Sequence, residues 1–172
     1  MKKEEVIQYI CTQQTYKNSI PIKDKFSYVW LTEYSKIPDL EWMCRSITIT
    51  LPDWEQAPNL RDIQRRFKAG SKVLLQYYNG TPVGWFWLNE SLTFDWIKIE
   101  KNLPTDNSAY SGGAFVTKNT QIPFDTGSQL YAKFYNLAFK HYKTMYGIVD
   151  IWNKPSIKLS VRLGASTIGN LL

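Results

Sequence analysis

The chain has 172 residues, of which 44% are apolar and 15% are aromatic, and this composition excludes an intrinsically disordered protein. Its formal net charge of +6 favours anionic partners, among them nucleic acid, anionic lipid and phosphate-bearing small molecules. The length predicts a single domain over residues 1–172, in which residues 1–25 can be a loosely packed N-terminal segment.

The cysteines and the apolar runs indicate the compartment. The sequence contains no run of about 18 apolar residues that could cross a membrane, and the start has no secretory leader pattern. Cys11 and Cys44 lie far apart and lack any partner motif, which predicts free thiols rather than a disulfide or a metal site. We therefore expect a cytoplasmic protein without a metal ion.

The first third of the chain shows few strong patterns. Val6, Ile7 and Ile10 suggest a weak helical start, and Pro21 ends whatever precedes it. The aromatic and β-branched run 26–32 predicts a strand. Residues 59–68 predict a helix with apolar side chains at helical spacing, which Gly70 ends.

Residues 72–78 and 82–88 predict two strands of a hairpin around Asn79-Gly80-Thr81. Asn-Gly between apolar runs is a strong hairpin signal, because both residues tolerate the positive φ that a tight turn demands. In the second strand two tryptophans point to one face and two other large apolar side chains to the opposite face, so we expect both faces to be covered (Trp85 and Trp87; Phe86 and Leu88).

Residues 109–117 predict a strand that Gly112 and Gly113 weaken, which indicates a bulge or the close approach of a ligand. The longest predicted helix follows, and its start Thr126-Gly127-Ser128-Gln129 fits a capping box. The free N–H groups at such a start form an anion site suited to phosphate. His141, the single histidine, is expected on the buried face of this helix.

Residues 147–165 predict a strand, a polar corner at Asn153, and a short helix that begins near Pro155 and ends at Gly164. Asn153, Ser156 and Ser160 are spaced to form a polar stripe at the corner and down that helix. Strands that alternate with helices after a hairpin indicate an α/β or α+β fold built on one sheet.

The order of three of these features resembles the GCN5-related N-acetyltransferases. The hairpin 77–85 is similar to the second and third strands of that family, and residues 114–116 with Gly127 to Leu130 are similar to its fourth strand, pyrophosphate loop and following helix. The stretch 153–164 is similar to its conserved strand-to-helix motif without a gap. The resemblance covers residues 72 to the C-terminus.

The resemblance implies a single mixed sheet that is splayed at its centre and flanked by helices. It also implies transfer of an acyl group from acetyl-CoA or another acyl-CoA to the amine of a small molecule, for which the many aromatic residues suggest an amino sugar. The residues expected to contact the acyl-CoA are Phe115, Val116, Thr117, Thr126, Gly127, Ser128, Gln129, Asn153 and Ser156. The catalytic candidates are Ser160, Tyr110 and Asp95.

Two departures from the family pattern leave a second interpretation open. Asp125 stands at the middle glycine of the pyrophosphate loop, and Ser160 stands where many members carry a tyrosine that protonates the departing thiolate. The alternative is a non-catalytic domain of the same fold that binds acyl-CoA or a protein partner.

Nucleic acid is a weaker alternative, because it rests only on charge and on the basic stretch 61–72. We therefore expect neither nucleic acid nor membrane as a partner. A homodimer stays open.

Overall fold

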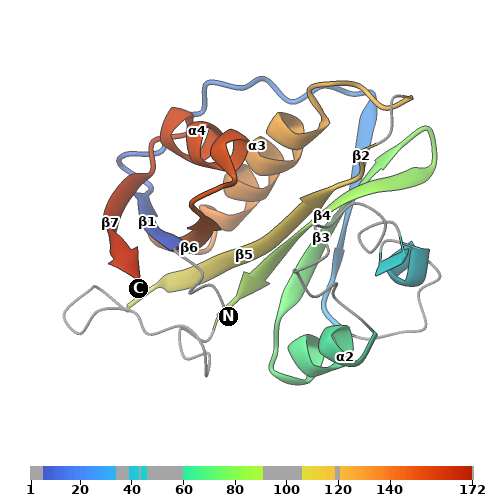
Figure 1. The fold of residues 1–172 in the computed structure, drawn as a ribbon, viewed down its shortest axis with the longest axis horizontal. Helices are drawn as coiled ribbons and strands as arrows, with labels where there is room; N and C mark the ends of the chain where they lie inside the picture. The colour runs from blue at the N-terminus through green and yellow to red at the C-terminus, as the bar shows by residue number, and fades with distance from the viewer. Residues whose placement is uncertain are drawn as a thin grey trace.

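The computed structural model describes residues 6–33, 39–42, 44–45, 60–90, 106–118 and 121–171. Seven strands form one mixed sheet, with helices on both of its faces (Figure 1). The elements with defined bounds are β1 (Val6–Thr12), β2 (Phe26–Leu31), α2 (Leu60–Lys68), β3 (Lys72–Tyr78), β4 (Thr81–Asn89), β5 (Ser108–Val116), α3 (Thr126–Ala138), β6 (Thr144–Asp150), α4 (Lys154–Arg162) and β7 (Ser166–Leu171).

The sheet has the strand order β2-β3-β4-β5-β6-β1-β7. Every neighbouring pair is antiparallel except β5 and β6, which run parallel. Their ladder joins residues 108–111 to residues 144–147 and ends at the pair Ser111–Gly147, although both strands continue. The predicted mixed sheet with a central splay is therefore confirmed.

The hairpin of β3 and β4 is also confirmed. Asn79 and Gly80 have φ of 49° and 77°, the left-handed values that a two-residue turn requires. The side chains of Trp85 and Trp87 pack on one face of β4 and those of Phe86 and Leu88 on the other, and all four are at most 3% exposed.

The glycines of β5 form a bulge against β4. Trp87 lies opposite Gly112 and Trp85 lies opposite Phe115, so β5 has one more residue than β4 between these two pairs. Gly113 has a φ of +65°, which explains why a residue without a side chain stands at this position. The bulge lies beside the last pair of the β5–β6 ladder.

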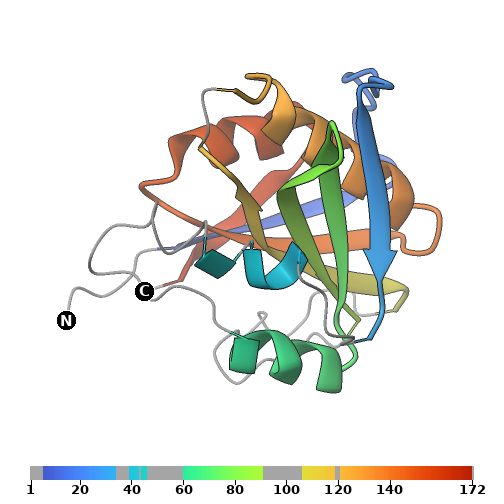
Figure 2. The same cartoon turned by 90° about the vertical axis from the view of Figure 1, so that its right-hand side faces the viewer.

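Helices α3 and α4 lie on one side of the sheet and α2 on the other (Figure 2), and an apolar core lies under each of these layers. The larger core lies between the sheet and α3 and α4, and it is built around Phe86, Leu130 and Phe134. The smaller core lies on the side of α2, where Ile63 and Phe67 pack against the tryptophans of β4. Cys11 and Cys44 are both buried, and neither forms a disulfide with a described residue.

The helical start predicted near residue 6 is wrong, because this segment is strand β1, which lies between β6 and β7. Tyr9 and Cys11 point into the larger core and Ile10 packs on the opposite face, the alternation of a strand. The strand partners of β1 lie near the other end of the chain, so no local pattern marks this pairing.

Two details of α3 also differ from expectation. The capping box does not form, because Gln129 bonds instead to the segment before β2, accepting from the N–H of Lys23 and donating to the carbonyl of Pro21. Thr126 donates to the carbonyl of Pro123 rather than capping the helix. His141 lies beyond the end of α3 and is exposed, so its predicted burial is wrong.

Candidate active site in the gap between β5 and β6

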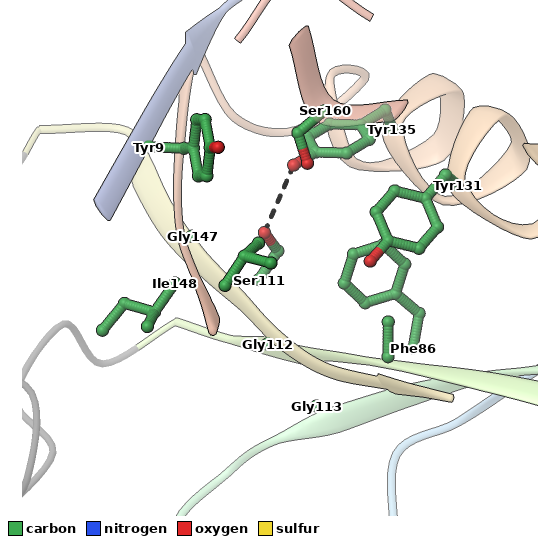
Figure 3. A pocket seen from close by; sticks show the side chains of 12 residues that line it. Tyr9, Phe86, Ser111, Gly112, Gly113, Tyr131, Tyr135, Gly147, Ile148 and Ser160 are labelled. Atoms are coloured by element: carbon green, nitrogen blue, oxygen red, sulfur yellow. Dashed lines mark hydrogen bonds between the residues drawn. The ribbon is translucent and has the colours of Figure 1, made fainter. Parts of the chain in front are cut away.

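A pocket lies where β5 and β6 part, on the face of the sheet that carries α3 and α4 (Figure 3). It offers about 30 Å³ to water-sized groups, enough for one or two of them. Its walls come from six elements, with Phe86 on β4, Ser111 on β5, Gly147 on β6, Tyr9 on β1, Tyr135 on α3 and Ser160 on α4. The elements meet here because β5 and β6 no longer pair beyond Ser111 and Gly147, and side chains from the neighbouring elements line the space between them.

A chain of hydrogen bonds connects α3, β5 and β6 at the wall of the pocket. The Ser111 hydroxyl donates to the carbonyl of Tyr146 at 3.1 Å, and Oη of Tyr135 lies 3.4 Å from Oγ of Ser111. Because the single proton of Ser111 goes to a carbonyl, Tyr135 must be the donor to Ser111. Burial raises the pKa of Tyr135, so its phenol keeps that proton.

The polar stripe of α4 faces α3 and the pocket. The Asn153 side chain accepts from the N–H of Ser156 at 3.3 Å and thereby caps the helix. Oγ of Ser156 lies 3.3 Å from Oη of Tyr131 on α3. Ser160 is 4% exposed and lines the pocket.

The backbone of β5 beyond the ladder presents polar groups to the gap. The N–H of Thr117 donates to the carbonyl of Val83, near the start of β4. Since backbone groups alternate in direction along a strand, those of Phe115 point to β4 and those of Val116 point to the side of β6. The register thus leaves the N–H of Val116 facing the gap.

The start of α3 carries a compact charged cluster. Nζ of Lys23 and Nζ of Lys25 lie 2.5 Å and 3.0 Å from the two carboxylate oxygens of Asp125. The hydrogen bond from Lys23 is the main cause of a lowered pKa of Asp125, against the effect of burial, and Lys25 adds to it. With two cations and one anion the cluster is net positive, and it lies at the start of the helix.

Comparison with known proteins gives a clear answer for the fold alone. No protein-family model and no curated protein matches the chain. Solved structures do match: a tandem GNAT protein from the clavulanic acid biosynthesis pathway superposes with a TM-score of 0.62 at 11% identity, over 99% of this chain and 52% of that protein. The chain has the GNAT fold.

Two further matches to the GNAT fold have informative ligands. An aminoglycoside acetyltransferase from an uncultured soil metagenomic sample, solved with trehalose, gives a TM-score of 0.56 at 13% identity, over 83% of this chain and 90% of its own. A Salmonella typhimurium protein solved with acetyl-CoA gives a TM-score of 0.57 at 16% identity, over 82% of this chain and 79% of its own. The chain spans about half the length of the tandem protein and of other solved proteins that it matches.

Within the GNAT fold, the structure places the residues expected to contact acyl-CoA around the gap and the start of α3, with one exception. Val116 and Ser160 lie at the gap, Asn153 and Ser156 on the neighbouring helix, and the remainder at the end of β5 and the start of α3 (Thr117; Thr126, Gly127, Ser128 and Gln129). Gln129 and Thr126 are buried and already hydrogen-bonded within the chain. Phe115 packs with the core on the side of α2.

The structure does not bring the three catalytic candidates together. Tyr110 lies on the face opposite the pocket, where a side chain added to Gly112 would overlap its ring. Burial raises the pKa of Tyr110, and the nearby Arg66 opposes that rise. Asp95 lies outside the described residues.

Sequence reasoning missed Tyr9, Lys23 and Lys25, which the fold brings to the pocket and to the start of α3. The local signal was the group of β-branched residues Val6, Ile7 and Ile10 around Tyr9, which favours a strand. In the described part of the chain, no group of three His, Cys, Asp or Glu side chains could hold a metal ion. No helix within that part is long and apolar enough to cross a membrane.

Proposed function

We propose that the chain is an acyl-CoA-dependent N-acyltransferase, with acetyl-CoA as donor and a small-molecule amine as acceptor. The observation that carries the proposal is the gap in the sheet, where the β5–β6 ladder stops at Ser111 while β5 continues to Val116. An edge inside a sheet can bond an extended ligand as it would bond a strand. The pantetheine arm of coenzyme A is such a ligand, because amide groups recur along it.

The two ends of the gap suit the two ends of acyl-CoA. The start of α3, with the net positive cluster of Lys23, Lys25 and Asp125, favours the phosphates. The pocket at the other end is small, about 30 Å³, which supports a short acyl group such as acetyl over longer acyl chains. The aminoglycoside acetyltransferase among the fold neighbours makes amino sugars the first acceptors to test.

In the proposed reaction the neutral amine nitrogen attacks the thioester carbonyl carbon, the carbon–sulfur bond breaks, and coenzyme A leaves. The residues at the gap would hold the reactants rather than react covalently. The N–H of Val116 would orient the arm of the donor, and the hydroxyl of Ser160 would lie beside the thioester.

Calorimetric titration with acetyl-CoA tests the first half of the proposal. We expect saturable heat and a rise in the unfolding temperature, because a ligand that binds only the folded chain stabilises it. The absence of both at millimolar ligand would contradict the proposal. ATP serves as the control for the phosphate-bearing half alone, and desulfo-coenzyme A as the control for the donor without its sulfur.

A non-catalytic acyl-CoA binding domain is the second candidate, and it is favoured by Ser160 standing where the resemblance implies a tyrosine. Thiol release from acetyl-CoA separates the two candidates when it is measured with a panel of amino sugars, polyamines and peptides. Saturable release with any acceptor establishes catalysis. Binding of acetyl-CoA without release across the panel would favour the binding domain.

A further inference from the structure

The hydroxyl of Tyr9 has no hydrogen-bond partner among the residues that the structure describes. Tyr9 is 3% exposed, so water does not reach it freely. A buried hydroxyl without a partner costs free energy, and most such groups in proteins are paired. The partner of Tyr9 must therefore come from outside these residues.

The register places Tyr9 where the sheet opens. Tyr9 lies opposite Gly147 in the β1–β6 ladder, and Gly147 forms the last pair of the β5–β6 ladder with Ser111. Gly147 has no side chain to separate Tyr9 from the pocket, and the phenolic oxygen of Tyr9 is turned into the pocket (Figure 3). A ligand that enters the gap meets this hydroxyl.

The other two tyrosines of the pocket are already engaged. Tyr135 bonds Ser111, and Tyr131 lies within hydrogen-bond distance of Ser156. Tyr9 is thus the phenol of the described pocket whose hydroxyl has no hydrogen-bond partner among the described residues. Burial raises the pKa of Tyr9, so the phenol carries its proton at neutral pH.

We propose that Tyr9 hydrogen-bonds the sulfur of bound acyl-CoA and gives the departing thiolate its proton, an inference that rests on the proposed function. As nitrogen bonds to the carbonyl carbon, the carbon–sulfur bond breaks and its electron pair stays on sulfur, which takes the phenolic proton. The amine nitrogen loses its proton to solvent, and solvent reprotonates the tyrosinate. The N-terminal strand β1 would then supply a catalytic residue to a pocket otherwise built by β4, β5, β6, α3 and α4.

Tyr9→Phe separates this role from a structural one. Because the hydroxyl bonds nothing within the described chain, its removal should leave the unfolding temperature unchanged or raise it. Tyr16→Phe is the matched control, since Tyr16 donates to Asn136 at 2.6 Å outside the pocket, and its loss should lower the unfolding temperature. A fall of several degrees in Tyr9→Phe would show that the hydroxyl has a protein partner and would overturn the inference.

A double-mutant cycle tests the contact with sulfur without knowledge of the acceptor. Coenzyme A and desulfo-coenzyme A, which lacks the sulfur, are titrated into the wild-type protein and into Tyr9→Phe. We expect the variant to bind coenzyme A about 3- to 10-fold more weakly and desulfo-coenzyme A with unchanged affinity. Tyr16→Phe should weaken neither ligand.

The outcomes distinguish the two proposals. A wild-type protein that binds neither ligand contradicts the proposed acyl-CoA function itself. A wild-type protein that binds coenzyme A, paired with a variant that loses equal affinity for both ligands or for neither, overturns the role of Tyr9 and leaves acyl-CoA binding intact. In that second case the hydroxyl bonds a trapped water rather than sulfur.

Discussion

Asp125 is the residue whose charge most affects the start of α3. Its carboxylate is nearly buried, and Lys23 and Lys25 hold both of its oxygens. A carboxylate beside a phosphate would repel it, so Asp125 is a departure from the glycine that the resemblance implies at this position. The two lysines change that expectation, because they neutralise the carboxylate and leave one positive charge over for an anion.

Asp125→Asn should lower the free energy of unfolding by about 1–2 kcal/mol at pH 7, because two charge-assisted hydrogen bonds are lost. The folded pKa of Asp125 is lowered, so its contribution is complete above the unfolded carboxyl pKa of about 3.9 and is lost as pH falls through the folded value. Urea unfolding at pH 7 and at pH 3 measures the difference.

Asp24→Asn is the control for that substitution, because it removes the same charge from the residue between Lys23 and Lys25. Asp24 is exposed and forms no ion pair with a described residue, so its replacement should change the free energy of unfolding by less than about 0.5 kcal/mol. Equal effects of the two variants would show that net charge, rather than the cluster, is responsible.

At the scale of elements, the end of α4 is fixed against the chain that follows β1. The N–H of Lys17 donates to the carbonyl of Leu163, and Gly164 has a φ of +96°. A Cβ at Gly164 would overlap the backbone of Thr15. This contact is one reason why the position tolerates only glycine, and it holds the N-terminal segment to α4.

Gly164→Ala should lower the free energy of unfolding by about 3 kcal/mol or more, from the left-handed backbone and the overlap together. Gly70→Ala is the matched control, since Gly70 has a φ of +82° and no atom near its added Cβ, and we expect about 1 kcal/mol. Denaturant unfolding measures both. Equal losses would mean that the overlap with Thr15 is relieved without cost.

The proposed binding of acetyl-CoA in the gap between β5 and β6 uses one backbone donor that a single substitution removes. Val116→Pro deletes the N–H that faces the gap without breaking the pairing with β4, so acetyl-CoA should bind at least 10-fold more weakly while thermal unfolding stays cooperative. Phe115→Pro deletes a donor to β4 instead, and its loss should appear mainly as lower stability. Unchanged affinity in Val116→Pro would place the ligand elsewhere.

Sequence patterns predicted most elements from β2 onward because their signals are local. Asn79-Gly80 specifies its own turn, and Gly112-Gly113 marks its own bulge. The polar stripe of α4 was readable for the same reason, and it brought Ser160 to the expected helix. Tyr110 illustrates the limit, because the face of a strand that a side chain occupies depends on register across the sheet.

At the scale of the whole molecule, strand β1 joins the two ends of the chain. It pairs with β6 on one edge and with β7 on the other, so β7 reaches the sheet only through β1. The partners of β1 are fixed by tertiary contacts rather than by its own seven residues, which is why Tyr9 could not be assigned to a site from sequence.

Removal of residues 1–12 should therefore destabilise the protein more than removal of residues 166–172. The first deletion takes out an interior strand, the Tyr9 and Cys11 side chains of the larger core, and the only partner of β7 among the described strands. The second deletion removes an edge strand that pairs on one side. Thermal unfolding followed by circular dichroism measures both, and a protein without residues 1–12 that still melts cooperatively at the wild-type temperature would show that β6 can end the sheet unaided.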